Sequence, residues 1–352
     1  MSGATSELVV RAERAVADLN HRDPAPASLE GLARQLMRSE ALASSQIEGL
    51  AVSHRKLAQA SIEGLGHHRA MAVLGNMHAM EKAIEIGTSA DPITRQDIAD
   101  IHAAIAIVPP LDRIAGKYRE EQGWIGGDSP IHAEFVPSPA LELTRLVEDL
   151  CEFLARDDLP AVAQAAIAHA QFETIHPFGD GNGRVGRCLI HVTLRRRGLA
   201  PNYVPPISLL LGANKDAYIA GLESFRRDDV EPWLAQFARV TESSALQAEH
   251  FSDAINRLQE AWIEAASPMR ADSAARVVIA NLPAFPYITV KIVEHLTGRS
   301  NVTALNALAR LTEASILTRH PNRGKGDSWE AKELFMLLDE FEGAVKDVQA
   351  ER

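Results

Sequence analysis

Apolar residues recur three and four positions apart along most of the chain, whereas runs that alternate apolar and polar residues are nearly absent. The first spacing places apolar side chains on one face of a helix, and the second is typical of strands. Alanine-rich segments and a low aromatic content of 5% also favour helices. The pattern therefore predicts a mainly α fold.

Capping residues, glycines and prolines indicate where the helices begin and end. A first helical unit is predicted from about Leu29 to Ile86, with Ser28 as its cap and a break at Gly49. Thr94 precedes the next unit. Further helices are expected at Leu141–Leu154, after Pro160, from about Gly183 to Arg197, at Lys215–Phe225 and at Glu231–Ile263.

Two segments interrupt the helical pattern. Residues 109–139 are rich in glycine and proline, and within them Ile125–Gly127 and Ala133–Val136 are typical of two extended pieces joined by a turn. We therefore expect a short β-hairpin. The dipeptide Ser267-Pro268 is a candidate linker to a last unit that starts at about Met269.

Composition limits the class of protein. Of the 352 residues, 46% are apolar, which excludes a disordered chain. No apolar run approaches the ~20 residues that a membrane span needs, and the start lacks the features of a secretory signal. We therefore expect a cytoplasmic protein that does not enter a membrane. The formal net charge of −11 argues against non-specific nucleic-acid binding, and Cys151 and Cys188 lack metal-site spacing.

The most informative stretch is HPFGDGNGRVGR, residues 176–187. Its glycines allow backbone N–H groups to face an anion at a helix N-terminus. Arg184 and Arg187 are three residues apart, so both project from the first helical turn and are suited to hold phosphates. The combination predicts a phosphate site. The glycines whose backbone would face the phosphate are Gly179, Gly181 and Gly183.

Two further side chains add chemistry beside this phosphate site. Asp180 is a hard oxygen ligand, suited to Mg²⁺ that is also bound by substrate phosphates. His176 is the only side chain of the loop with a pKa suited to accept a proton from a hydroxyl. The alternative interpretation is a glycine-rich connection with a capping Asp and a packed His.

This stretch resembles the signature HxFx[DE]GNGRxxR of the Fic family at every fixed position. The resemblance implies transfer of AMP from ATP to a protein hydroxyl, with release of pyrophosphate. Carried over by position, His176 would be the general base, Asp180 the Mg²⁺ ligand and Phe178 an apolar anchor of the loop. The residues that would bind ATP are Gly179, Gly181, Asn182 and Gly183 around the inner phosphates, and Arg184 and Arg187 at the distal phosphates.

Segments on either side of the loop extend the resemblance. The hairpin before it resembles the flap of Fic proteins, whose edge aligns an extended segment of the target protein. Asn214 and Tyr218, after the loop, lie four residues apart where the family places residues near the nucleotide base, although Tyr218 is also compatible with simple packing. The predicted flap residues are Ile125, Gly126, Gly127 and Phe135.

An N-terminal motif, SSQIEG at residues 44–49, places Ser44 and Glu48 on one helical face, with Gly49 permitting a turn. Taken alone it is compatible with an ordinary solvated helix end. Beside the loop it resembles the inhibitory motif of Fic proteins, in which the Glu pairs with the second arginine, here Arg187, and displaces the γ-phosphate. The resemblance implies low resting activity.

The last unit resembles a winged helix, with helices at Thr289–Leu296 and Asn301–Leu311 separated by a turn at Gly298 and followed by a basic wing. One interpretation is DNA binding, and the other is protein docking or dimerisation. The residues that would face bases are Asn301, Thr303 and Asn306. The basic residues of the unit are Lys291, Arg299, Arg310, Arg319, Arg323 and Lys325.

These features predict four parts of the chain. Residues 1–90 form an N-terminal helical region with the inhibitory motif, and residues 91–242 form a Fic-type core. Residues 243–268 form a connecting helix, and residues 269–352 form the winged-helix-like unit.

The leading hypothesis is an autoinhibited protein adenylyltransferase that depends on ATP and Mg²⁺. It would modify a Ser, Thr or Tyr hydroxyl of a target protein and of itself, and it could assemble as a homodimer. One alternative is a Fic-fold enzyme that transfers UMP or phosphate or removes AMP. Another alternative is a DNA-binding regulator that senses ATP.

Overall fold

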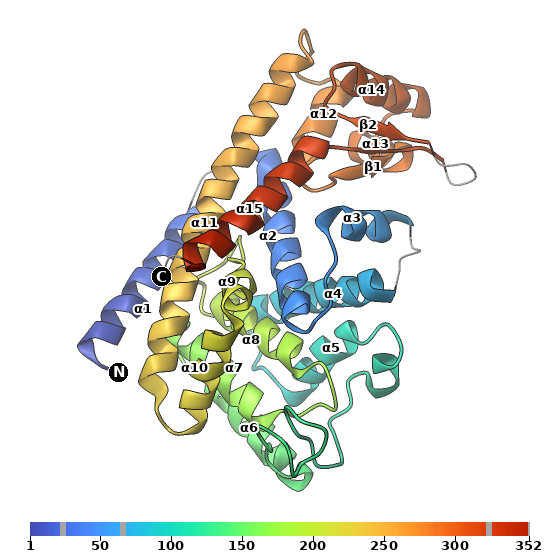
Figure 1. The fold of residues 1–352 in the computed structure, drawn as a ribbon. Coiled ribbons are helices and arrows are strands. Elements are labelled where there is room, and N and C mark those ends of the chain that lie inside the picture. Colours follow the sequence, from blue (N-terminus) through green and yellow to red (C-terminus); the bar gives the residue numbers. More distant parts are fainter. Residues whose placement is uncertain (22–25, 64–67, 322–325, 351–352) are drawn as a thin grey trace.

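The computed structural model describes residues 1–21, 26–63, 68–321 and 326–350. Helices form most of this part of the chain, and a three-stranded antiparallel sheet lies at one end (Figure 1). The predicted mainly α fold is therefore confirmed. Among the helices of these ranges, none is both long and apolar enough to cross a membrane.

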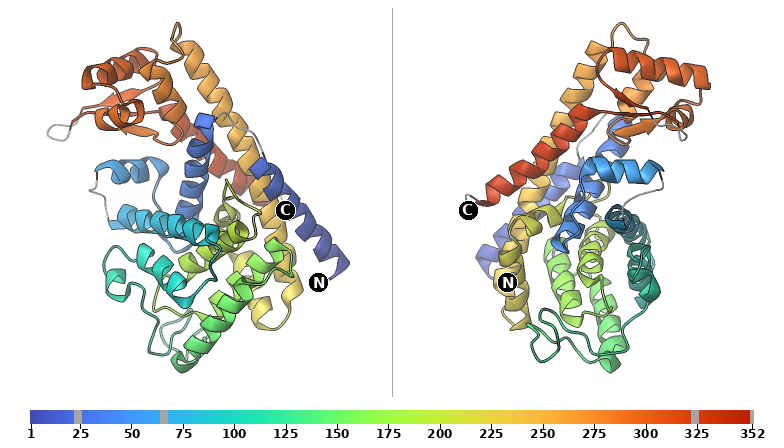
Figure 2. Two further views of the ribbon diagram at one scale, coloured as in Figure 1. Left: turned by 180° about the vertical axis from the view of Figure 1, so that it is seen from behind. Right: turned by 45° about the vertical axis from the view of Figure 1, so that its right-hand side comes forward.

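Two helices that are far apart in sequence lie side by side along one edge of the molecule (Figures 1 and 2). Helix α1, Gly3–His21, packs along α11, Val230–Ala265, which is 36 residues long. Val16 and Leu19 of α1 are fully buried. The apolar pattern does not predict α1, because its stripe consists mainly of alanine and valine between charged residues.

The N-terminal unit consists of α2 (Pro26–Ile47), α3 (His54–Glu63) and α4 (His68–Thr88). The predicted break is present, and Gly49 has a left-handed φ of +79°, which a glycine adopts without strain. The predicted cap is wrong, because α2 begins before Ser28 and includes it. Proline is favoured at a first helical position, so the helix starts there instead.

Helices α7 (Ala161–Ile175) and α8 (Asn182–Arg196) form the centre of the molecule, and most residues of both are buried. Helices α4 and α5 (Arg95–Ile105) pack against α8, while α6 (Leu143–Leu154) and α10 (Lys215–Arg226) pack against α7. The short loop that joins α7 to α8 is thus held between packed helices. Shorter elements are the 3₁₀ turns Leu111–Ile114 and Ala140–Glu142 and helix α9, Ile207–Ala213.

The predicted hairpin is much less regular than expected. Its arms, Ile125–Gly127 and Ala133–Val136, are joined by one β-bridge between Ile125 and Phe135. The Ile125 N–H donates to the Phe135 carbonyl over 2.9 Å, and the Phe135 N–H donates back over 3.1 Å. Gly126 and Gly127 have φ values of +70° and +67°. Because this conformation cannot continue a strand, pairing ends after one bridge.

The C-terminal unit combines α12 (Ala274–Asn281), α13 (Val290–Thr297) and α14 (Asn301–Glu313) with the sheet. The strands pair in the order β1-β3-β2. Helix α15, Lys332–Ala350, then packs on α9 and α11 (Figure 1). The strands are β1, Tyr287–Thr289, β2, Thr318–His320, and β3, Ser328–Glu330.

The turn between α13 and α14 has the expected local chemistry. Gly298 ends α13 with a left-handed φ of +63°, and the Ser300 hydroxyl accepts a hydrogen bond from the Thr303 N–H to cap α14. Strands β2 and β3 follow these two helices, and the winged-helix assignment of the unit stays a prediction. Arg323 and Lys325 of the predicted basic wing lie outside the described residues. The four-part division of the chain stays a prediction.

Candidate active site

The loop between α7 and α8 starts and ends with left-handed backbone. His176 follows the last residue of α7 with φ +50° and ψ +61°, and Gly181 precedes α8 with φ +83°. A non-glycine residue in this region costs about 1 kcal/mol or more, so the surroundings of His176 must hold it there. The backbone at Gly181 directs the first N–H groups of α8 towards the loop, as an anion site requires.

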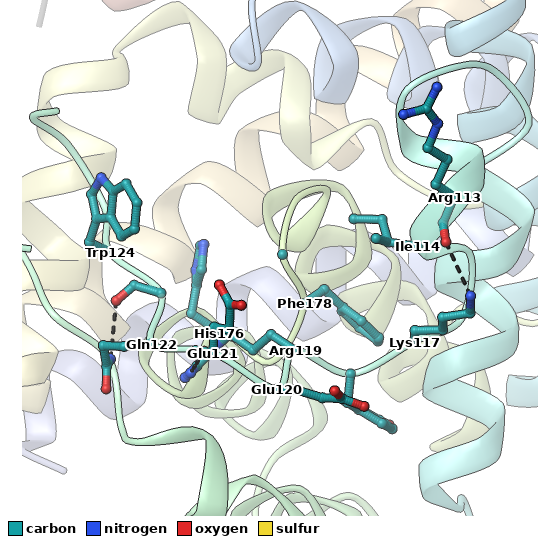
Figure 3. Close-up of a pocket in the computed structure, with 13 residues that line it drawn as sticks. Arg113, Ile114, Lys117, Arg119, Glu120, Glu121, Gln122, Trp124, His176 and Phe178 are labelled. Carbon is teal, nitrogen blue, oxygen red and sulfur yellow. Dashed lines mark hydrogen bonds between the residues drawn. The ribbon is translucent and has the colours of Figure 1, made fainter. Parts of the chain in front are cut away.

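The imidazole of His176 lines a cleft of about 640 Å³ between the loop and residues 113–124. Figure 3 shows His176 and Phe178 in this cleft, with Trp124 towards one end and Arg113 towards the other. Gly179 also lines it. Cavities of about 300 to 1,000 Å³ accommodate small-molecule ligands, and this cleft has that size beside the His176 imidazole, although neither motif arginine lines it.

Phe178 anchors the loop, as its position in the motif predicts. Its side chain is buried and lies between two rings. The ring of His102 is stacked on it at a centroid distance of 3.9 Å, and the ring of Tyr118 at 4.9 Å. The three stacked rings tie the loop to α5 and to the chain that leads into the flap.

His102 is a positioning residue that the sequence motif does not contain. Its Nδ1 accepts a hydrogen bond from the Gly116 N–H, and its Nε2 donates to the Asp180 carbonyl, each over 3.0 Å. Burial lowers the pKa of His102, which favours this neutral tautomer. The sequence does contain a sign of this role, because His102 lies among the buried isoleucines of α5. A polar side chain in a core position needs hydrogen-bond partners.

Asn182 closes the loop with its side chain. Its Oδ1 accepts from the Phe178 N–H over 2.9 Å, and its Nδ2 donates to the Phe178 carbonyl over 2.8 Å. Both polar groups of the buried amide are therefore used within the protein. Only the backbone N–H of Asn182 is left to contribute to an anion site, together with those of its glycine neighbours.

Arg119 is the second positioning residue outside the motif. Its Nε donates to the His176 carbonyl over 2.9 Å, and its Nη1 donates to the Glu121 carbonyl over 2.9 Å. Its Nη2 donates to the Ser138 carbonyl over 2.5 Å. One guanidinium therefore fixes the backbone of His176 and both ends of the flap segment. No local pattern marks this role, because the His176 and Ser138 carbonyls approach Arg119 only in the fold.

The electrostatic environment keeps His176 neutral. Its side chain is 21% exposed, and its Nδ1 lies 3.9 Å from Oε2 of the buried Glu173. Burial lowers the pKa of His176 to about 4, and the nearby Arg226 and Arg119 guanidinium groups act in the same direction. Burial also raises the pKa of Glu173 to about 7. At neutral pH the imidazole therefore has a lone pair available to accept a proton.

This environment predicts an unusually low titration midpoint for His176. Because the folded-state pKa is about 4, about nine-tenths of the imidazole should still be neutral at pH 5, and protonation should follow as the pH falls through 4. An NMR titration of the imidazole Cε1–H signal, assigned with the His176→Asn variant, measures the midpoint. A midpoint near 6.5, the value of an exposed histidine, would contradict the described burial.

The two arginines of the motif have different partners. Arg187 is almost fully buried, and its Nε donates to the Ser44 hydroxyl over 2.9 Å while its Nη2 donates to the Ser44 carbonyl over 2.8 Å. The same Nη2 lies 2.7 Å from Glu48 Oε1. Arg184 is also buried, with its Nη2 4.0 Å from Asp180 Oδ1. Arg184 thus has fewer close hydrogen-bond and ion-pair partners within the protein than Arg187 has.

The Glu48 carboxylate lies directly over the start of α8. A Cβ atom at Gly183 would lie only 2.2 Å from Glu48 Oε1, so the absence of a side chain there allows the approach. Although burial opposes it, the charge of Arg187 and its hydrogen bond lower the pKa of Glu48. The carboxylate is therefore charged and lies at the helix N-terminus, where an anion is stabilised.

The remaining predicted residues lie around this centre. Phe135 of the flap packs under the Arg226 guanidinium at 4.0 Å from the ring centroid. Asn214 accepts a hydrogen bond from the Ala217 N–H and so caps α10. Tyr218 is buried, and its hydroxyl lies 2.7 Å from His169 Nε2. Asn214 and Tyr218 therefore have structural partners in the protein.

Asp180 has the properties of a single-carboxylate magnesium ligand. Its side chain is 69% exposed, and the hydrogen bond it accepts comes from the neighbouring Gly181 N–H over 2.5 Å. Within the described ranges, three or more His, Cys, Asp or Glu side chains do not gather anywhere into a metal-binding group. One accessible carboxylate fits Mg²⁺, which binds through one or two carboxylates and substrate phosphates.

The fold and this site define a helical protein with a helix N-terminus suited to an anion and a neutral histidine beside it. Comparisons with known proteins agree. The profile described as Fic/DOC family matches residues 92–194, and the profile described as Fic/DOC family N-terminal matches residues 6–85. The chain belongs to the Fic/DOC family.

Curated relatives share part of their length with this chain. Protein adenylyltransferase fic-1 of Caenorhabditis elegans is 27% identical over 155 residues, which is 44% of this chain and 28% of that protein. Protein adenylyltransferase Fic of Drosophila willistoni is 30% identical over 153 residues, which is 43% of this chain and 28% of that protein. The chain thus spans less than a third of the length of these relatives.

Solved structures share the fold. A Fic family protein from Desulfovibrio desulfuricans G20 aligns over 94% of this chain and 96% of its own, with a TM-score of 0.59 and 20% identity. Fic-1 of C. elegans aligns over 71% of this chain and 73% of its own, with a TM-score of 0.58 and 21% identity. The predicted Fic-type helical core is therefore present.

Proposed function

We propose that this protein transfers AMP from ATP to a hydroxyl group of a protein, with release of pyrophosphate. The observation that carries the proposal is the neutral His176 imidazole in an open cleft, next to the N-terminus of α8 and two buried arginines. The names of the curated relatives, which are protein adenylyltransferases, support the same activity.

In this proposal each residue of the loop has a defined task. His176 accepts the proton of the target hydroxyl, whose oxygen forms a bond to the α-phosphorus of ATP. The bond from that phosphorus to the bridging oxygen breaks, and pyrophosphate leaves with the electron pair. The N–H groups at the start of α8 stabilise the α- and β-phosphates, and Arg184 and Arg187 bind the distal phosphates. Mg²⁺ held by Asp180 would neutralise phosphate charge.

We further propose that the N-terminal unit inhibits this reaction. Glu48 and Ser44 occupy the hydrogen-bonding groups of Arg187, which a bound γ-phosphate requires. A productive ATP must therefore displace a charged, partly buried hydrogen bond, which lowers the population of the competent state. Gly49 follows Glu48 just beyond the end of α2, and its left-handed φ lets the chain turn away from this contact.

The flap would present the target. Its single bridge leaves most N–H and C=O groups of residues 125–127 and 133–136 without a strand partner in the same segment. Such an edge can pair with an extended peptide through main-chain hydrogen bonds. A Ser, Thr or Tyr of the target, or of the chain itself, would then reach His176.

Differently labelled ATP tests the proposed reaction. After incubation with Mg²⁺, ATP labelled on the α-phosphate should label the protein covalently, whereas ATP labelled on the γ-phosphate should not. Intact-protein mass spectrometry should show an increase equal to AMP, and EDTA should abolish it. Label from the γ-phosphate would instead support phosphate transfer. If no labelling occurs even when Glu48 is replaced, the proposal is wrong.

We propose that the winged-helix-like unit docks a protein or a second copy of the chain. The exposed face of α14 includes Val302 and Leu305, and its Arg310 donates to the carbonyls of Ala266 and Pro268. This face therefore offers apolar contacts rather than free cations, which DNA phosphates would need. Salt-dependent binding to duplex DNA would favour the DNA-binding alternative.

A further inference from the structure

A second cavity lies away from the loop, where the N-terminal unit meets the C-terminal unit. It has a volume of about 470 Å³ and is lined by residues of α2, α3 and α4 and by residues 285–292. In Figure 1 this is the region where α3 lies next to β1. Apolar side chains cover part of the wall, among them Ile62, Met77 and Phe285.

Arg38 of α2 gives this cavity its chemical character. Its side chain lines the cavity and is only 8% exposed. Its Nη1 is buried and has no hydrogen-bond partner, and among the described residues no carboxylate lies within ion-pair distance of the guanidinium. The neighbouring Arg34 differs, because its Nε lies 3.0 Å from Glu30 Oε1 and its guanidinium stacks over the Phe285 ring.

The charge of Arg38 persists despite its burial. Burial and, to a smaller extent, the charge of Arg34 lower the pKa of Arg38, Glu81 partly opposes both, and the resulting pKa is about 10. The guanidinium is therefore still protonated at neutral pH. A buried charge without an ion-pair partner is unfavourable. A well-packed protein has little reason to retain such a group unless a ligand completes its environment.

The other charges around the cavity favour an anion. Arg34 and Lys291 line it in addition to Arg38, and Glu81 is the single carboxylate that lines it among the described residues. Guanidinium groups bind phosphate through paired, charge-assisted hydrogen bonds. The apolar wall adds a surface for a non-polar part of the same ligand.

We propose that this cavity binds a small organic phosphate. The phosphate pairs with Arg38, and the organic part rests against the apolar wall that includes Met77 and Phe285. The ligand bridges α2 to the C-terminal unit. The site is separate from the anion site at α8, and the proposal does not depend on the reaction proposed for that site.

Calorimetric titration of the full chain with phenyl phosphate tests this proposal. The wild type should bind one equivalent. Arg38→Met should weaken binding at least about 30-fold, because loss of one partner of a buried charge pair costs about 2 kcal/mol or more, which corresponds to that factor. The matched control Arg14→Met, at an exposed position of α1, should bind as the wild type does. Inorganic phosphate should bind more weakly than phenyl phosphate, because it lacks the apolar part.

Thermal unfolding separates a binding role of Arg38 from a structural one. Without ligand, Arg38→Met should unfold at the same temperature as the wild type or higher, because methionine removes an unpaired charge and fills the space. A marked decrease would show that Arg38 is structural and would overturn the proposal. Absence of binding to the wild type, equal binding of inorganic phosphate, or binding that survives Arg38→Met would also overturn it.

Discussion

Glu48→Gly is expected to raise the rate at which the protein adenylylates itself by about 5- to 150-fold. This range corresponds to a coupling free energy of 1–3 kcal/mol between two sites. The reason is the 2.7 Å contact between the Glu48 carboxylate and Arg187, which occupies the guanidinium that the distal phosphate needs. With the carboxylate removed, Arg187 keeps its contacts to Ser44 but has a free hydrogen-bonding position for ATP.

The initial rate of AMP incorporation measures this effect, at one fixed concentration of ATP and Mg²⁺. Gln46→Gly is the matched control, because it introduces the same residue in the same turn at an exposed position. This control measures how a glycine that destabilises the last turn of α2 changes the rate by itself. Its rate should equal that of the wild type. An unchanged or lower rate in Glu48→Gly, with ATP binding intact, would refute the inhibitory role of this carboxylate.

His176→Ala is expected to lower the transfer rate by about 10²- to 10⁴-fold, the usual contribution of a general base. ATP affinity should change little, because the imidazole is neutral and makes no ion pair with a phosphate at pH 7. The effect should therefore appear in kcat rather than in the dissociation constant of ATP. The Glu48→Gly background makes the starting rate high enough to measure the decrease.

His250→Ala provides the control for this experiment, since His250 is exposed on α11 and lies outside the cleft. Its rate should match that of the parent protein. If His176→Ala transfers AMP as fast as the parent, the proton is accepted elsewhere and the proposed mechanism is wrong. A loss of ATP binding in the same variant would instead point to a structural role for His176.

The local chemistry of the loop is determined by residues that are close in sequence. Gly181 lies where the backbone is left-handed, and Gly183 lies where a side chain would collide with a neighbouring group. Arg184 and Arg187 lie on one turn of the helix that follows. Periodicity and caps likewise determine most helix boundaries. For this reason the mainly α fold and the phosphate-site motif can be predicted without coordinates.

The sequence pattern fails where backbone conformation and distant contacts decide the outcome. The hairpin is reduced to one bridge by two left-handed glycines, which composition alone does not distinguish from strand residues. Helix α1 forms because α11 covers its weak apolar stripe. For α1 the stabilising free energy therefore comes from packing against α11 and not from local helix propensity.

The tertiary structure alone decides the electrostatics of this protein. Whether a histidine is neutral, or an arginine paired, depends on burial and on groups far away in sequence. Arg119 reaches His176 across 57 residues, Glu48 reaches Arg187 across 139, and Arg38 is enclosed without reaching any described carboxylate. The sequence by itself determines the helices and the loop motif, because both depend on neighbouring residues. The fold decides which titratable side chains are neutral, which form ion pairs and which remain available to a ligand. Only packing brings these groups together and excludes water from them.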